Sequence, residues 1–187
     1  QVDVSLNHPN KEIKKEAEEI VSLMTPVIKS FFSDSGMEIT NEAIQVFGGY
    51  GYTKDQGIEQ LYRDNRITPI YEGTNSVQAI DLVFRKVLNN KILNKFIKII
   101  NNEIDNNQSN NDLKNFSNIL KKNVKTLTDF SNWLEEKNKN KKDDVSSACN
   151  DFLKVLGYIS LGFAWFKMTK VSLKKTNENK NFYEKKI

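Results

Sequence analysis

One carboxylate, Glu72, lies in a stretch of apolar and small residues that runs from Ile70 to Gln78. It comes directly before Gly73 and Thr74, a pair that can begin a helix. Such a carboxylate is either an acidic residue that stabilises a helix N-terminus or a general base that removes a proton from a substrate. The first role is structural and the second is catalytic, so the role of Glu72 decides what the protein does.

Helices are predicted to carry the residues around Glu72. The chain has only three prolines and eight glycines, and the long intervals between them favour helices over a many-stranded sheet. Apolar residues recur at helical spacing over 13–31, where Pro26 is expected to kink or divide the helix. Gly36 is expected to end this helix as a left-handed cap, and Thr40 to cap the next one.

The glycine-rich residues 48–52 predict a turn, and a further short helix is expected over 55–64. After the Glu72 loop, Thr74 or Asn75 is expected to cap a long helix. The apolar pattern of that helix continues to residue 100, with a break expected at Asn89 and Asn90.

The second half of the chain is also predicted to be helical. Residues 101–111 are polar and rich in asparagine, which is typical of a linker or of a frayed helix end, and we expect the domain boundary there. An amphipathic helix is predicted over 113–134. A second helix, over 148–168, is apolar on most of its faces, so it must be buried centrally or lie against a partner. Trp133 and Trp165 lie on apolar faces and are predicted to be core residues.

Composition excludes several classes of protein. No stretch of eighteen apolar residues occurs, so no membrane span is expected. Cys149 is the only cysteine, which rules out an internal disulfide or a cysteine cluster for a metal. The net charge of +4 comes from lysines scattered among asparagines without interleaved aromatic residues, so we expect neither nucleic-acid binding nor a metal site. A reducing location is expected, either a bacterial cytoplasm or an organelle matrix.

Three blocks of sequence resemble one family in order and spacing. They are residues 45–52 (QVFGGYGY), 59–67 (EQLYRDNRI) and 70–78 (IYEGTNSVQ). Together they closely resemble the signature of the acyl-CoA dehydrogenase flavoenzymes. The match extends to residues 23–29 and 34–36, and more loosely to 152–158, 161–165 and 181–186, which are similar to a branch of the family with an added C-terminal helical domain.

The resemblance implies an all-α architecture of two parts and a catalytic role for Glu72. It implies an antiparallel helical bundle over 1–100, a linker over 101–111 and an additional, smaller helical domain over 112–187. Glu72 matches the family's catalytic base, which takes a proton from the carbon next to the thioester carbonyl while a hydride leaves the next carbon for FAD. Tyr71 and Gly73 would contact the acyl-CoA, and the backbone amide of Glu72 would donate to the thioester oxygen.

The resemblance also implies two segments that bind FAD. The first would reach the adenosine-pyrophosphate part, commonly across a subunit interface, and comprises Gln45, Val46, Phe47, Gly48 and Gly49. Glycines there would let backbone amides approach a phosphate closely. The second is the start of the next helix, at Thr74, Asn75 and Ser76. These three residues could also simply cap the helix, and both roles are compatible.

The implied partners are an acyl-CoA substrate, an electron-transfer flavoprotein and further copies of the chain in a dimer or tetramer. The chain lacks an initiator methionine and the segments that hold much of the flavin and acyl sites in the family. We therefore expect a C-terminal fragment that is catalytically silent alone. The competing hypothesis is a helical assembly or interaction module that kept the family fold without its chemistry.

Overall fold

The computed structural model of the chain describes residues 2–108 and 110–175. Every regular element in these two ranges is helical, which confirms the all-α prediction. The elements are α1 (Val2–Asn7), α2 (Lys11–Phe47), the 3₁₀ helices η1 (Gly48–Tyr52) and η2 (Lys54–Gln56), α3 (Ile58–Asn65), α4 (Asn75–Ile80), the π-helix η3 (Asp81–Asn89), α5 (Ile92–Asp105), the 3₁₀ helix η4 (Asn111–Leu113), α6 (Lys114–Asn138) and α7 (Lys142–Lys175). The predicted closing segment at 181–186 lies outside the described residues.

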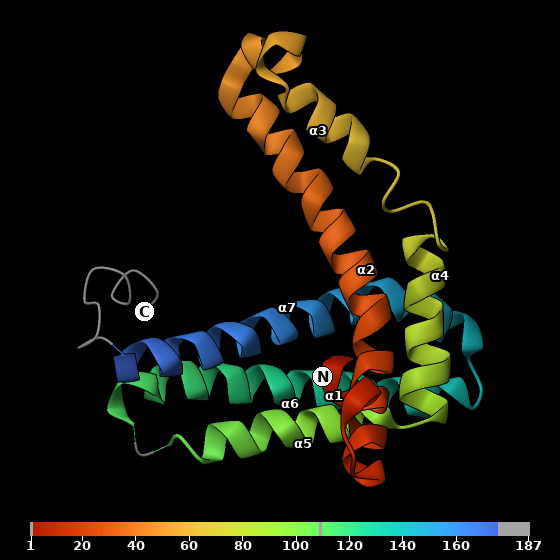
Figure 1. Cartoon of the computed structure of the whole chain (residues 1–187). Coiled ribbons are helices and arrows are strands. Elements are labelled where there is room, and N and C mark those ends of the chain that lie inside the picture. Colours follow the sequence, from red (N-terminus) through yellow and green to blue (C-terminus); the bar gives the residue numbers. More distant parts are fainter. Residues whose placement is uncertain (1, 109, 176–187) are drawn as a thin grey trace.

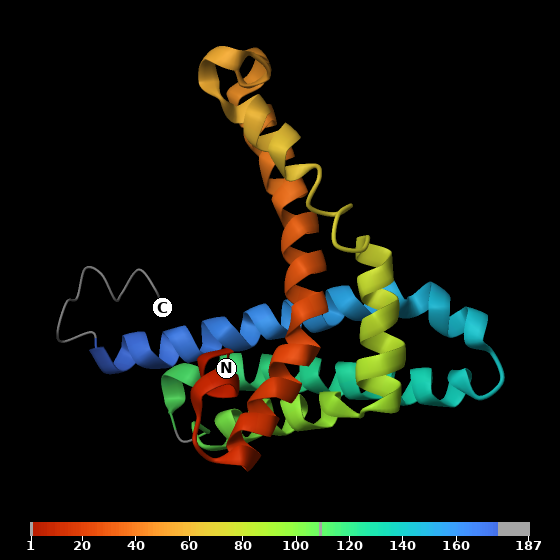
Figure 2. The same cartoon turned by 45° about the vertical axis from the view of Figure 1, so that its right-hand side comes forward.

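α5, α6 and α7 run side by side in both views, and each connection reverses the chain direction (Figures 1 and 2). α2 crosses these three helices steeply and continues beyond them as an arm, with α3 folded back along it. The largest fully buried apolar side chains come from α2, η3, η4, α5, α6 and α7 and belong to one core: Leu23, Leu82, Val83, Leu93, Ile100, Ile104, Leu113, Leu127, Leu134, Phe152, Leu156 and Phe166. Burial of these side chains is the main force that fixes α2 across the other helices.

α2 is one helix where the sequence predicted two. Asn10 caps it, because its Oδ1 accepts hydrogen bonds from the backbone N–H groups of Glu12 and Ile13. The helix is not divided at Pro26 and does not end at Gly36. The predicted cap at Thr40 is also wrong.

Gly36 and Thr40 have other uses inside α2. A β-carbon on Gly36 would lie 2.9 Å from Nδ2 of Asn65, so this glycine lets α3 approach α2 closely. Thr40 Oγ1 donates to the carbonyl of Gly36 at 2.8 Å, a bond within the helix that a side-chain cap would not make. The glycine therefore marks a close contact between helices, which local sequence cannot distinguish from a helix end.

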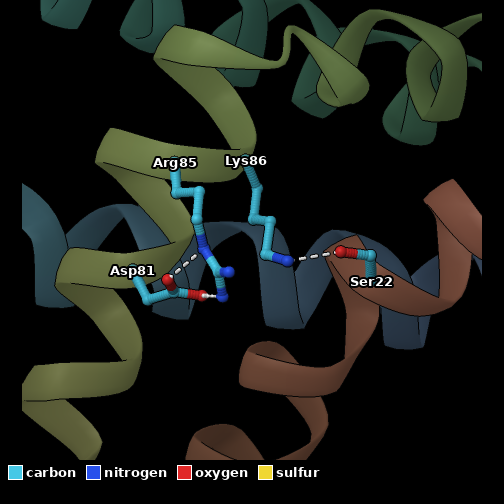
Figure 3. Close-up of polar contacts among 4 residues, drawn as sticks. All are labelled: Ser22, Asp81, Arg85 and Lys86. Atoms are coloured by element: carbon cyan, nitrogen blue, oxygen red, sulfur yellow. Dashed lines mark hydrogen bonds and ion pairs between the residues drawn. The ribbon is translucent and has the colours of Figure 1, made fainter.

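η3 connects α4 to α5 and is tied to α2 by Lys86. Figure 3 shows the Lys86 ammonium donating to Oγ of Ser22 on α2, while Arg85 and Asp81 form a two-point ion pair at 2.6 and 2.9 Å. Burial lowers the pKa of Lys86, and the charge of Arg85 lowers it further. After η3 the helix is interrupted at Asn90 and Lys91, and Lys91 is left-handed (φ 52°). This interruption is close to the predicted break at 89–90.

α5 extends into the segment that was predicted to be a linker. It ends at Asp105, so residues 101–105 are helical. The helix predicted over 113–134 is confirmed as α6, and the one predicted over 148–168 as part of α7. The division of the chain into two domains around 101–111 stays a prediction. No helix in the described ranges is long and apolar enough to cross a lipid bilayer.

Trp133 and Trp165 are not core residues, so that prediction is wrong. Their side chains are 37% and 58% exposed. At 100° per residue, Trp165 lies on the opposite side of α7 from the buried Leu156, nine positions earlier. Other helices cover the side of α7 that carries Leu156, and they leave Trp165 uncovered. The apolar pattern of α7 alone did not show which side the other helices cover.

Candidate active site

Glu72 belongs to the irregular loop between α3 and α4. This loop lies at the base of the arm (Figure 1). Turns lead into the loop: the Ile70 and Tyr71 amides both donate to the Ile67 carbonyl, at 3.0 and 3.1 Å. Glu72 itself has φ 54° and Gly73 has φ 81°, so two successive residues are left-handed. The left-handed conformation is unfavourable for a residue with a β-carbon by about 1–2 kcal/mol, and such strain clusters at functional sites.

Two side chains hold the carbonyl groups of this loop. Gln78 Nε2 donates to the Glu72 carbonyl at 2.9 Å, and Lys29 Nζ donates to the Gly73 carbonyl at 2.7 Å. In contrast, the backbone amides of Glu72 and Gly73 donate no hydrogen bond within the part of the chain that the structure describes. The loop therefore has its acceptors satisfied and two of its donors available.

The start of α4 is bound mainly to α2. Of the two predicted caps, Thr74 is the N-cap, and its Oγ1 accepts a hydrogen bond from the Val77 amide at 3.4 Å. Asn75 directs its side chain at α2, where Nδ2 donates to Asp34 Oδ1 at 2.7 Å and Oδ1 accepts from Lys29 at 2.8 Å. Ser76 is exposed and accepts a 3.4 Å hydrogen bond from Asn150 on α7. The roles of these residues toward FAD stay predictions.

The predicted pyrophosphate segment lies at the far end of α2, away from the Glu72 loop (Figures 1 and 2). Its five residues, Gln45, Val46, Phe47, Gly48 and Gly49, are all exposed. Gly48 ends α2 with φ 61°, and β-carbons built on Gly48 and Gly49 would meet no atom within 4 Å. The backbone is therefore open to close approach there. The fold does not bring this segment and Glu72 together within the described residues.

Around Glu72 the surface is open. Its apolar neighbours Ile70 and Tyr71 are 46% and 48% exposed, and Glu72 and Gly73 are exposed as well. Three surface hollows of the described chain are lined by α2, α5, α6 and α7 and include no residue of this loop. The described residues contain no group of three or more His, Cys, Asp and Glu side chains placed to hold a metal ion. What the loop offers is a carboxylate beside available amide donors.

Comparison with known proteins identifies the family. The model of the acyl-CoA dehydrogenase C-terminal domain matches residues 11–87, and a second model, described as acetyl-CoA dehydrogenase C-terminal like, matches residues 93–187. The chain belongs to the acyl-CoA dehydrogenase family. This confirms the resemblance seen in the sequence. The two matched regions of this acyl-CoA dehydrogenase chain meet around the break between η3 and α5.

Several curated acyl-CoA dehydrogenases are similar to part of the chain. It is 41% identical over 81 residues to 3-methylmercaptopropionyl-CoA dehydrogenase of Ruegeria pomeroyi, covering 43% of this chain and 14% of that protein. It is 48% identical over 60 residues to cyclohexane-1-carbonyl-CoA dehydrogenase of Geobacter metallireducens, covering 32% and 16%. It is 54% identical over 52 residues to the probable acyl-CoA dehydrogenase FadE25 of Mycobacterium tuberculosis, covering 28% and 13%. The matched part is thus less than a fifth of each relative.

Two residues of this acyl-CoA dehydrogenase chain, Lys29 and Gln78, bind the loop, a role that the sequence analysis did not assign to them. Gln78 is on the helix that Thr74 caps, and a Gln at that place reads as an ordinary helical residue. Lys29 lies 44 residues before Gly73, on a different helix. No periodicity or motif spacing connects positions so far apart, and only the packing of α2 against α4 brings them together.

Proposed function

We propose that the chain supplies the catalytic base and part of the FAD site of an FAD-dependent acyl-CoA dehydrogenase. The observation that carries the proposal is the geometry of the Glu72 loop. Two successive left-handed residues hold a carboxylate next to backbone amides that have no partner in the described chain. General bases need a positioned carboxylate, and developing negative charge on a carbonyl oxygen needs fixed donors nearby.

The reaction is the oxidation of an acyl-CoA to a trans-2-enoyl-CoA. Glu72 removes the proton from the carbon next to the thioester carbonyl, and the Glu72 amide donates to the thioester oxygen as charge develops there. Tyr71 and Gly73 border the substrate on either side of the base. An acyl chain lying against Ile70 and Tyr71 excludes water from Glu72, which strengthens its interactions with the substrate.

Two places on the chain would contact FAD. The open backbone at Gly48 and Gly49 admits a pyrophosphate, with Gln45, Val46 and Phe47 exposed beside it. The start of α4, at Thr74, Asn75 and Ser76, would border the cofactor near Glu72. FAD, when bound, supplies the hydride acceptor for the oxidation. These two places lie apart within one chain, which supports a site shared between copies in a homo-oligomer. The electrons would leave to an electron-transfer flavoprotein.

The test is a Glu72→Gln substitution in the complete protein that carries this chain. The amide keeps the shape of the side chain but cannot take the proton, so turnover should fall by at least about 10³-fold. The purified protein should stay yellow, because the binding of FAD would not depend on the Glu72 carboxylate. The matched control is Glu136→Gln, at an exposed position on α6. Turnover that survives in Glu72→Gln would place the base elsewhere.

The chain by itself should be silent. Residues 1–187 mixed with FAD and acyl-CoA should give no enoyl-CoA, because the loop is open to water on its exposed side. Detectable product would contradict this expectation.

A second candidate function is that of an interaction module without chemistry. It is supported by the exposed apolar residues of α7 that share one side of the helix: Tyr158, Trp165 and Met168, at spacings of seven and three. This candidate predicts that the complete protein binds no flavin and that Glu72→Gln changes nothing. Absorbance of the purified protein near 450 nm distinguishes the two functions.

A further inference from the structure

Lys29 joins the middle of α2 to both sides of the turn that follows Glu72. Its ammonium donates to the Gly73 carbonyl at 2.7 Å and to Oδ1 of Asn75 at 2.8 Å. The side chain is half-buried between these acceptors, so it has few alternative positions. One lysine thus contacts Gly73 in the loop and Asn75, the first residue of α4.

The side chain of Asn75 can have only one orientation. Its Nδ2 donates to Asp34 Oδ1 at 2.7 Å and to Ser33 Oγ at 2.9 Å, while its Oδ1 faces Lys29. A flipped amide would place its NH₂ group against the Lys29 ammonium and its oxygen against the Asp34 carboxylate, and both contacts are repulsive. Lys29 therefore acts on α4 through the Asn75 side chain, whose orientation is fixed.

Holding these carbonyls also sets the direction of the loop amides. A trans peptide unit is planar, and its C=O and N–H groups point in opposite directions. Lys29 at the Gly73 carbonyl therefore turns the Thr74 amide away from α2. Gln78, on α4, holds the Glu72 carbonyl and so turns the Gly73 amide away from the Gln78 side chain. The left-handed conformation of Glu72 and Gly73 is held from two sides.

We propose that Lys29 is a positioning residue that holds the Glu72 loop in its left-handed conformation by binding the Gly73 carbonyl and the Asn75 side chain. Its effect on turnover rests on the proposed function, whereas its effect on the loop does not. Lys29 acts through the loop and touches no reacting atom. A lysine that only stabilised the fold would change the unfolding temperature without changing turnover per bound flavin.

Loop order is tested on the full chain by hydrogen exchange of the segment 71–78. Lys29→Met keeps the length and apolar stem of the side chain but cannot donate. Loss of charge-assisted hydrogen bonds should speed exchange of the Asn75 and Val77 amides about ten-fold. Lys29→Arg can still donate and should restore part of the protection. The control is Lys15→Met, an exposed position on the same helix with no side-chain partner within the described ranges. Unchanged exchange in Lys29→Met would overturn the proposal.

Positioning is tested in the complete protein by steady-state kinetics. Lys29→Met should lower kcat per bound flavin by about 10- to 100-fold, because a displacement of about 1 Å at a base has effects of that size. The KM for acyl-CoA and the flavin content should change little, and Lys29→Arg should recover part of the rate. Faster exchange with an unchanged kcat would overturn the positioning role. If Glu72→Gln retains turnover, the proposed function fails, and the exchange experiment still decides whether Lys29 holds the loop.

Discussion

Gly157 lies where α7 crosses α2, and substituting it tests how closely the two helices pack. A β-carbon built on Gly157 would fall 2.4 Å from Cδ2 and 2.7 Å from Cγ of Phe31. Phe31 is buried and its ring packs edge-on against Tyr158, with centroids 5.0 Å apart. Because Cγ is the root of the ring, relief requires a change of χ1 or a shift of the helix. Gly157→Ala should therefore overpack the crossing.

Gly162, five residues further along α7, is a matched control. A β-carbon there would meet only Leu120 Cδ1, at 3.9 Å, which is an ordinary contact. Both substitutions gain about 1 kcal/mol from helix propensity, so this gain cancels in their difference. Overpacking destabilises by about 1–3 kcal/mol. Gly157→Ala should thus be less stable than Gly162→Ala by about 2 kcal/mol, or roughly 4–8 °C in melting temperature for a chain of this size.

The assay is thermal and urea unfolding of the unsubstituted chain and its variants, including Phe31→Leu alone, followed by far-ultraviolet circular dichroism. The double variant Phe31→Leu with Gly157→Ala gives an internal check, because a smaller side chain should make the alanine less unfavourable. If Gly157→Ala is as stable as Gly162→Ala, or if the double variant shows no coupling, α2 and α7 do not pack as closely as described.

Two further predictions concern buried titratable groups. Burial raises the pKa of Cys149 from 9.0 to about 11, so the folded chain keeps its proton longer than the unfolded chain does. The stability that this thiol contributes is fully present below pH 9 and falls between pH 9 and about 11, a fall that Cys149→Ala should remove from urea unfolding curves. The native thiol should also resist alkylation at pH 8 and react once the chain unfolds; rapid reaction of the folded chain would refute its burial. Burial lowers the pKa of Lys86 in the folded chain. At a pH just below 10.5 the unfolded chain therefore keeps this proton more fully than the folded chain does, and the free energy of unfolding rises with pH in that window. The native chain should therefore gain stability relative to Lys86→Met as the pH rises toward 10.5, and parallel curves of stability against pH would contradict the effect.

Local features of the sequence predicted the helices and the limits of the Glu72 loop well. Thr74 caps α4 as expected, since capping depends on a side chain and an amide three positions apart. The same reasoning failed at Gly36, because a glycine that ends a helix and a glycine that admits a neighbouring helix look alike in sequence. The prediction that Trp165 is a core residue failed as well, because α7 is apolar on more of its faces than other helices cover.

The sequence by itself determined the helical class, the family and the place of Glu72 at the start of a helix. Those properties follow from periodicity, capping and motif spacing, which act over a few residues to a few tens of residues. Only the tertiary structure decided that Lys29 meets Gly73 and that the Glu72 loop stands apart from the glycines at 48 and 49. The reason is physical: these arrangements depend on which buried faces of α2, α4 and α7 meet, and hydrophobic burial is not directional enough to specify the pairing from any one segment.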